Sequence, residues 1–166
     1  MRYIFMLLCF LAITPLAAET IGGVDYRLPK QGKGWKMIGG LEGSNESKTI
    51  LYIPANATRD TAREIFGVSS NNLPVGPTEQ DDLEQTIKLQ YPTQTICINI
   101  MDRDLQSVMF EWSVIDGSQE KVHGWTRTFG TPKGTVVLMY QTNDIRSVNQ
   151  ARPIWIKTLS DSKICK

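Results

Sequence analysis

His123 is the only histidine of the chain, and two carboxylates lie near it in the sequence, Glu111 and Glu120. A histidine beside a carboxylate can accept and return protons during hydrolysis. These three residues are therefore the candidates for acid–base catalysis. The alternative interpretation is that a lone strand histidine next to Gly124 and Trp125 is a surface or interface residue.

Other patterns that carry chemistry do not occur in the sequence. One histidine excludes a zinc site made of several imidazoles, and no cysteine pair has the spacing of metal ligands. The chain contains neither a Gly-x-Ser-x-Gly nucleophile motif nor a phosphate-binding loop. We therefore predict no metal and no cofactor, and no residue is assigned a catalytic role.

Arg127 is the second residue with a candidate role. It alternates with Trp125 and Phe129, so the three share one face of an expected strand. A guanidinium in this setting can bind an anionic ligand or stack on an aromatic ring. The alternative is a structural arginine paired with a carboxylate. Arg127, His123 and Trp125 are the candidate binding residues.

The first eighteen residues have the pattern of a secretory signal peptide. Arg2 provides a positive charge, Tyr3–Ile13 is almost continuously apolar, and the small residues Ala17 and Ala18 precede Glu19. The apolar run is shorter than the roughly 20 residues that span a bilayer. We expect cleavage after Ala18, with an uncleaved N-terminal anchor as the alternative. The chain should be exported to the periplasm or outside the cell, with no transmembrane segment in its mature part.

Removing 18 residues from 166 leaves 148 residues, which suits one domain over residues 19–166. The whole chain has a net charge of +1, and Arg2 belongs to the leader, so the mature chain is nearly neutral. A neutral domain has no basic excess with which to attract nucleic acid. We therefore expect no nucleic-acid partner.

Two cysteines, Cys97 and Cys165, remain outside the leader, which contains Cys9. An even number of cysteines in an exported chain predicts a disulfide. A Cys97–Cys165 bond would close a loop of about 70 residues and stabilise the fold by about 4 kcal/mol. Two unpaired thiols are the alternative.

Strands are expected throughout the chain and most clearly between Thr95 and Tyr140. That stretch has four apolar and β-branched runs separated by turn-forming residues, typical of consecutive antiparallel strands. Earlier strands are expected within Glu19–Pro29, at Trp35–Gly40 and at Thr49–Pro54.

Three segments have the periodicity of helices. Asn56–Gly67 has a suitable N-cap in Thr58, and Glu79–Tyr91 has an acidic first turn. The third segment is Ser147–Leu159, in which Pro153 favours a start near Ala151. The sequence therefore predicts an α+β domain: a mostly antiparallel sheet covered by two or three helices and joined by one disulfide.

The pattern resembles small exported proteins of unknown function from Gram-negative bacteria. The shared features are an early strand tryptophan, a Tyr-Ile-Pro strand end before a threonine-capped helix, a strand cysteine, an Arg-x-x-Gly strand end, and a late helix with Trp and Cys. In this chain they are Trp35, Tyr52–Pro54, Thr58–Phe66, Cys97, Arg127–Gly130, Trp155 and Cys165. The order of strands and helices also resembles the α/β/α sandwich of PsbP-type proteins. The resemblance implies a bacterial envelope or secreted protein.

Three hypotheses about function follow. The first is an exported, non-enzymatic domain that binds another protein, either in an envelope assembly or as a secreted factor. The second is a small secreted hydrolase that uses His123 with Glu111 or Glu120. The third is a periplasmic carrier of a small molecule, which requires an apolar pocket between the sheet and the helices.

Overall fold

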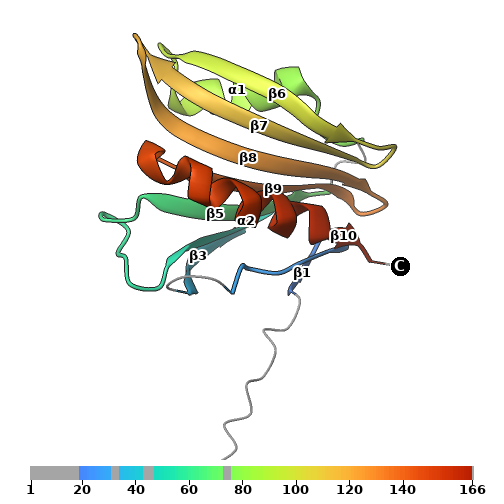
Figure 1. Ribbon diagram of the computed structural model, residues 1–166. Coiled ribbons are helices and arrows are strands. Elements are labelled where there is room, and N and C mark those ends of the chain that lie inside the picture. The colour runs from blue at the N-terminus through green and yellow to red at the C-terminus, as the bar shows by residue number, and fades with distance from the viewer. Residues whose placement is uncertain (1–18, 31–33, 43–46, 73–75, 166) are drawn as a thin grey trace, which may run out of the picture.

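A seven-stranded sheet forms the centre of the computed structural model, which describes residues 19–30, 34–42, 47–72 and 76–165 (Figure 1). In spatial order its strands are β3 (Trp35–Glu42), β4 (Lys48–Pro54), β5 (Glu64–Asn71), β9 (Gly134–Thr142), β8 (Gln119–Thr131), β7 (Ser107–Asp116) and β6 (Thr95–Arg103). All neighbouring strands pair in antiparallel fashion. The consecutive strands expected between Thr95 and Tyr140 are confirmed.

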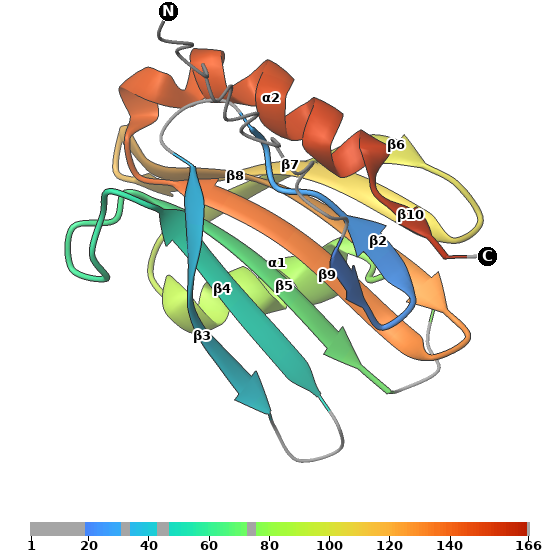
Figure 2. The same cartoon turned by 90° about the horizontal axis from the view of Figure 1, so that it is seen from below.

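Two helices and a second, smaller sheet cover the faces of the large sheet. Helix α1 (Gln80–Gln90) lies on one face, and α2 (Val148–Asp161) lies on the other (Figures 1 and 2). The small sheet has the order β1–β2–β10 and lies on the α2 side. Its strands are β1 (Glu19–Ile21), β2 (Val24–Tyr26) and β10 (Lys163–Ile164), and a turn of 3-10 helix, η2 (Ile145–Ser147), precedes α2.

The core under α1 is built from side chains of β6, β7 and β8. Leu83 and Ile87 lie one helical turn apart on α1, and both are buried. Trp112 of β7 packs over Gly124 of β8, where a Cβ atom would come within 2.3 Å of the indole ring. The Trp112 Nε1–H donates to Thr126 Oγ1 at 2.9 Å. Gly124 is therefore required for the packing of Trp112.

The core under α2 is the larger one, and aromatic rings dominate it. Trp155 of α2 stacks on Tyr140 with ring centroids 4.1 Å apart and on Phe66 with centroids 5.0 Å apart. Tyr140 in turn stacks on Trp125 at 5.8 Å, and Trp35 meets Trp155 edge-on at 5.3 Å. Each such pair contributes about 0.5–1.5 kcal/mol beyond the burial of its area. The stack therefore fixes α2 over the centre of the sheet.

Hydrogen bonds to Glu19 join the small sheet to the large one. Tyr26 donates its hydroxyl hydrogen to Glu19 Oε2 at 2.8 Å, and Tyr52 donates to the same oxygen. The two hydroxyl oxygens are 2.9 Å apart. Burial, reinforced by the hydrogen bond to Glu19, raises the pKa of Tyr52 to about 12. Both phenols thus stay protonated at neutral pH and hold β1 against β4.

The prediction of a disulfide between Cys97 and Cys165 is wrong. Cys97 lies on β6, the outer strand of the large sheet, whereas Cys165 follows β10 of the small sheet. Both thiols are exposed and unbonded, and Cys165 Sγ donates to Asp25 Oδ1 at 3.0 Å. Figure 1 shows β6 and β10 on opposite sides of the molecule. The chain end is joined to the domain by β-pairing and by a hydrogen bond from Cys165 N to Gly23 O at 2.8 Å.

The helix expected over Asn56–Gly67 is also wrong, which leaves two α-helices in the described residues instead of a possible three. A single turn forms there, with Ala62 N–H donating to Thr58 O at 2.9 Å. The following residues form β5, which inserts between β4 and β9. Phe66 and Val68 are fully buried in that position. Two flanking strands and this burial outweigh the local helix signals, which are weak by comparison.

Helix α2 begins before the predicted start near Ala151. Its first residue is Val148, and Pro153 lies inside the helix. Proline cannot donate to the carbonyl of residue 149 one turn earlier. Asn149 and Pro153 are both on the exposed side of α2, so water can satisfy that carbonyl. The burial of Trp155 and Leu159 then favours the longer helix.

We predict that Trp155→Ala lowers the free energy of unfolding by about 3–5 kcal/mol, because it removes the ring that stacks on Tyr140 and Phe66. Urea unfolding followed by circular dichroism measures this. The matched control is Lys157→Ala, an exposed position on the same helix, which should change stability by less than about 0.5 kcal/mol. Equal losses in the two variants would contradict the role of the stack.

We predict that both thiols of the protein lacking residues 1–18 react with a thiol reagent without denaturation. Cys165 should react more slowly, because its hydrogen bond to Asp25 raises the pKa of the thiol and lowers the thiolate fraction. Asp25→Asn should therefore accelerate the reaction of Cys165 and leave that of Cys97 unchanged. An intact mass lower by two hydrogen atoms, with no reactive thiol, would refute this prediction.

Candidate functional site

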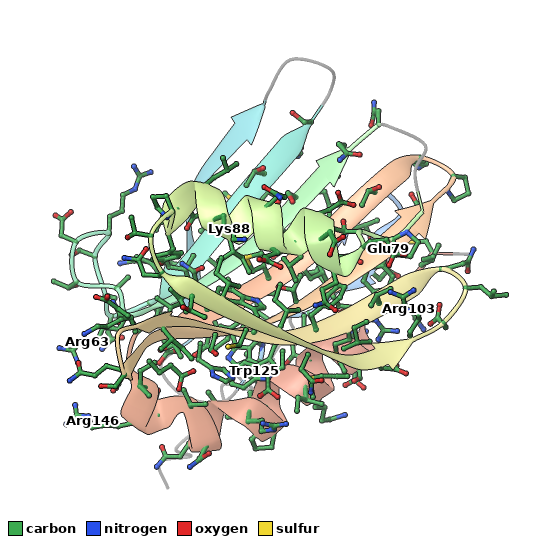
Figure 3. The ribbon with its side chains drawn as sticks, turned by 90° about the horizontal axis from the view of Figure 1, so that it is seen from above. Arg63, Glu79, Lys88, Arg103, Trp125 and Arg146 are labelled. Atoms are coloured by element: carbon green, nitrogen blue, oxygen red, sulfur yellow. The ribbon has the colours of Figure 1, made fainter. Side chains whose placement is uncertain are left out.

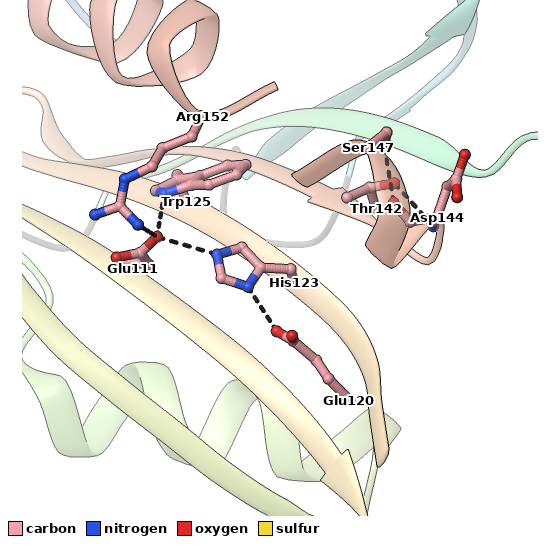
Figure 4. Close-up of polar contacts among 8 residues, drawn as sticks. All are labelled: Glu111, Glu120, His123, Trp125, Thr142, Asp144, Ser147 and Arg152. Atoms are coloured by element: carbon pink, nitrogen blue, oxygen red, sulfur yellow. Dashed lines mark hydrogen bonds and ion pairs between the residues drawn. The ribbon is translucent and has the colours of Figure 1, made fainter. Parts of the chain in front are cut away.

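Pairing of β7 with β8 brings the predicted site residues together. Glu111 is the partner of Trp125, and Ser113 is the partner of His123. Residues that pair across antiparallel strands point to the same face, so His123, Trp125 and Glu111 all lie on the α2 side of the sheet. Figure 4 shows this cluster beside the first turns of α2.

One carboxylate oxygen is the centre of the cluster. Glu111 Oε1 accepts a hydrogen bond from Trp125 Nε1 at 3.0 Å and lies 3.1 Å from His123 Nε2. Arg152 Nη1, from α2, donates to the same oxygen at 2.6 Å. The Glu111 and His123 side chains are each 13% exposed. Glu111 thus connects two strands and the covering helix from a largely buried position.

Glu120 reaches His123 from the other side because β8 contains a bulge. His123 Nδ1 lies 2.6 Å from Glu120 Oε1. In a regular strand residues 120 and 123 would point to opposite faces. The register shifts by one residue after the Val114–Val122 pair, so that Ile115 pairs with Glu120 and Lys121 has no partner in the pairing. The bulge places Glu120 on the face of His123.

His123 is held between two carboxylates. A doubly protonated imidazole donates to both carboxylates, whereas a neutral ring donates to one only. A general base needs a nitrogen that can receive a proton from the substrate or from water. While both contacts persist, neither ring nitrogen is available for this task.

The hydroxyl groups next to His123 are also committed. Thr142 pairs with His123 across β8 and β9, and its Oγ1 accepts from Asp144 N at 3.1 Å. Ser147 Oγ donates to the Asp144 carbonyl at 2.8 Å (Figure 4). These bonds shape the turn that leads into α2. Neither hydroxyl is paired with His123 as a nucleophile would be with its base.

Arg127 lies on the same face of β8 but outside the cluster. Its Nη1 donates to the Leu159 and Ser160 carbonyls at 3.0 and 3.1 Å, and its Nη2 donates to Ser107 Oγ at 3.0 Å. The guanidinium carbon is 5.0 Å from the centre of the Phe129 ring. The last carbonyls of a helix lack intrahelical partners and attract cations. In this structure Arg127 donates hydrogen bonds to carbonyl groups at the C-terminal end of α2.

Arg152 is the residue of the cluster that sequence reasoning missed. No motif or spacing connects it to Glu111, which precedes it by 41 residues. It is 47% exposed and lies on the polar side of α2, where an arginine usually needs no explanation. Only the placement of α2 over β7 and β8 reveals the contact.

Clefts A, B and C lie on the described surface, and His123, Glu111 and Glu120 line none of these three. Cleft A, about 540 Å³, lies beside the N-terminal half of α2 between Trp35 and Trp155. Cleft B, about 670 Å³, lies between the segment Asp25–Lys30 and the C-terminal half of α2. Cleft C, about 810 Å³, separates α1 from β4, β5 and β9. The carrier hypothesis expects a pocket in the position of cleft C.

Cleft C has a mixed lining. Its floor contains Leu51, Val137 and Met139, with threonines on both sides, and its α1 wall carries Glu79 and Asp82. Glu79 is paired with Arg103 of β6 at 2.6 Å, at the N-terminal end of α1 (Figure 3). In the described part of the chain no three or more His, Cys, Asp or Glu side chains are arranged to hold a metal ion. No described helix has the length and hydropathy of a membrane span.

Comparison with known proteins identifies the fold. The structure is similar to the solution structure of cyanobacterial PsbP (CyanoP) from Synechocystis sp. PCC 6803, with a TM-score of 0.62 and 13% sequence identity. The alignment covers 92% of this chain and 95% of that chain. The PsbP-like arrangement of layers is thereby confirmed. No protein-family model and no curated protein sequence matches the chain, so the likeness to exported proteins of Gram-negative bacteria has no support from sequence comparison.

We predict that Glu111→Gln lowers the free energy of unfolding by about 1–3 kcal/mol. An amide lacks the charge that pairs with Arg152 and His123 in a position that is only 13% exposed. The matched control is Glu120→Gln, whose carboxylate is 32% exposed and contacts His123 alone, with an expected loss below about 1 kcal/mol. Urea unfolding followed by circular dichroism distinguishes them, and a larger loss in Glu120→Gln would refute the central role of Glu111.

Proposed function

We propose that this chain is an exported bacterial domain that binds another protein and catalyses no reaction. The observation that carries the proposal is that the polar groups of the cluster around Glu111 contact one another. His123, Trp125 and Arg152 all converge on one oxygen of Glu111, and the other nitrogen of His123 contacts Glu120. These polar residues join β7, β8 and α2, so their role in the proposal is to stabilise the fold.

The surface supports the same proposal. Clefts A and B extend along α2 and combine aromatic, aliphatic and charged linings. Surfaces of this composition are typical of protein recognition, in which apolar side chains provide affinity and charged ones provide specificity. Export is part of the proposal because of the leader pattern of residues 1–18, which lie outside the described residues.

The hydrolase remains the alternative, and one observation favours it: His123 lies between two carboxylates, as a catalytic histidine often does beside one. That function requires His123 to be released from one carboxylate when substrate binds. It also requires a path for the substrate past Arg152, which covers Glu111 from α2.

His123→Ala separates the two functions. If the chain is a binding domain, we expect the His123→Ala variant to retain the partner protein. To measure this, the tagged variant and the tagged wild type are each isolated from the native host, and their elution and co-eluting proteins are compared. We also expect no turnover of chromogenic ester, peptide and glycoside substrates by wild type. Turnover by wild type that disappears in a folded His123→Ala variant would overturn the proposal in favour of the hydrolase.

A further inference from the structure

Clefts A and B adjoin each other along one side of α2. Pro29 and Ile154 line both of them. We call this combined surface the α2 groove. One wall is α2, and the other is made by the segment that leaves β2 together with the ends of β3 and β4 (Figure 2).

The length of the groove suits an extended peptide. Its lining residues on α2 run from Gln150 to Asp161. These twelve helical residues span about 18 Å at 1.5 Å per residue. An extended chain advances about 3.3 Å per residue, so the groove accommodates about five residues of a partner.

The floor of the groove is apolar, and the lining of cleft A also includes three charged residues, Arg63, Glu64 and Asp144. Trp35 and Trp155 form its aromatic part, with their rings at 84° to each other, and Ile154 and Ala151 continue it. Pro29 and Pro54 line the opposite wall. Trp155 is held by its stack on Tyr140 and Phe66, so the floor is pre-organised and an incoming side chain need not order it.

The end of the groove at cleft B is positively charged. Four cations line it, Arg27, Lys30, Lys157 and Lys163, against two carboxylates, Asp25 and Asp161. Asp161 pairs with Lys157 at 2.8 Å. Asp25 accepts hydrogen bonds from Thr20 and Cys165, and its negative charge also acts on Lys163 and Arg27, so the lining of cleft B has an excess of two positive charges.

The remaining cations are available to a ligand. Arg27, Lys30 and Lys163 take part in none of the ion pairs found among the described residues. All three side chains are exposed at the rim of cleft B. A partner that brings carboxylates to this rim completes the charge balance that the chain itself leaves open.

We propose that the α2 groove binds an extended acidic segment of the partner protein, with its carboxylates at Arg27, Lys30 and Lys163 and its apolar side chains over Trp35 and Ile154. This inference rests on the proposed protein-binding function and names its surface. A peptide is favoured over a membrane or a nucleic acid because the cations line a walled groove with an apolar floor. The chain as a whole has 18 basic against 17 acidic residues, so its surface as a whole has no basic excess.

The test uses the protein lacking residues 1–18 and a fluorescein-labelled octapeptide of alternating glutamate and valine. Fluorescence anisotropy should show saturable binding that weakens as ionic strength rises from about 0.05 to about 0.3 M. The same peptide with glutamine for glutamate should bind at least about tenfold more weakly. Arg27→Glu with Lys30→Glu should weaken binding by a similar factor, and Ile154→Ala by about threefold.

The matched control reverses two exposed lysines that do not line the groove, Lys48→Glu with Lys121→Glu, and should bind the peptide as wild type does. The proposal for the groove would be overturned if this control lost binding. It would also be overturned if Arg27→Glu with Lys30→Glu bound the peptide as tightly as wild type does. Binding of phosphatidylglycerol vesicles or an oligothymidylate with equal strength and equal dependence on Arg27 and Lys30 would also overturn it. Melting temperatures confirm that each variant is folded.

A second measurement separates this inference from the proposed function. The tagged full-length chain and its Arg27→Glu, Lys30→Glu variant are each isolated from the native host. If wild type retains a partner and the variant loses it, both the function and the groove are supported. If both retain the partner, the groove is refuted and the function stands. If wild type elutes alone, the protein-binding function itself fails.

Discussion

The stacking of Trp155 on Tyr140 and Phe66 is the contact on which the rest of the structure depends. It joins α2 to β9 and β5 in the middle of the sheet. Arg152 lies one turn before Trp155 and Leu159 one turn after it, and each meets a different strand residue. Arg152 reaches Glu111, and the Leu159 carbonyl accepts from Arg127. Placing one indole therefore positions both polar contacts and one wall of the α2 groove.

Polar residues serve two separate purposes in this molecule. On the sheet beneath α2, the partly buried charges are paired within the chain, because an unpaired charge at low exposure costs several kcal/mol. Glu111 with Arg152 and His123 follows this rule. At the rim of the groove, cations such as Arg27 and Lys30 remain solvated, and water satisfies them at little cost. Charges available for a partner are therefore found at the rim and not in the cluster.

There is a physical reason why this chain and cyanobacterial PsbP can share a similar fold at only 13% sequence identity. Strand pairing uses backbone groups, and cores accept many apolar sequences of suitable size and pattern. The alternation of Val136, Leu138 and Tyr140 is one way of filling the α2 side of β9. The cluster around Glu111 and the α2 groove depend on side chains such as Glu111 and Arg27. The apolar pattern of the core does not determine the residue types at these positions. Fold and function can therefore diverge.

The sequence by itself determined the local order of the chain: the antiparallel strands from Thr95 to Tyr140, the helix beginning after Glu79, and the candidates His123, Glu111 and Arg127. Period-two alternation and turn residues carry that information, because they act between near neighbours. Tertiary structure alone decided that Glu64–Asn71 is a strand, that Cys97 and Cys165 lie apart, and that Arg152 meets Glu111. It also placed Glu120 on the face of His123 through a bulge. These outcomes depend on which distant segments pack together, and that is set by burial summed over the whole sheet.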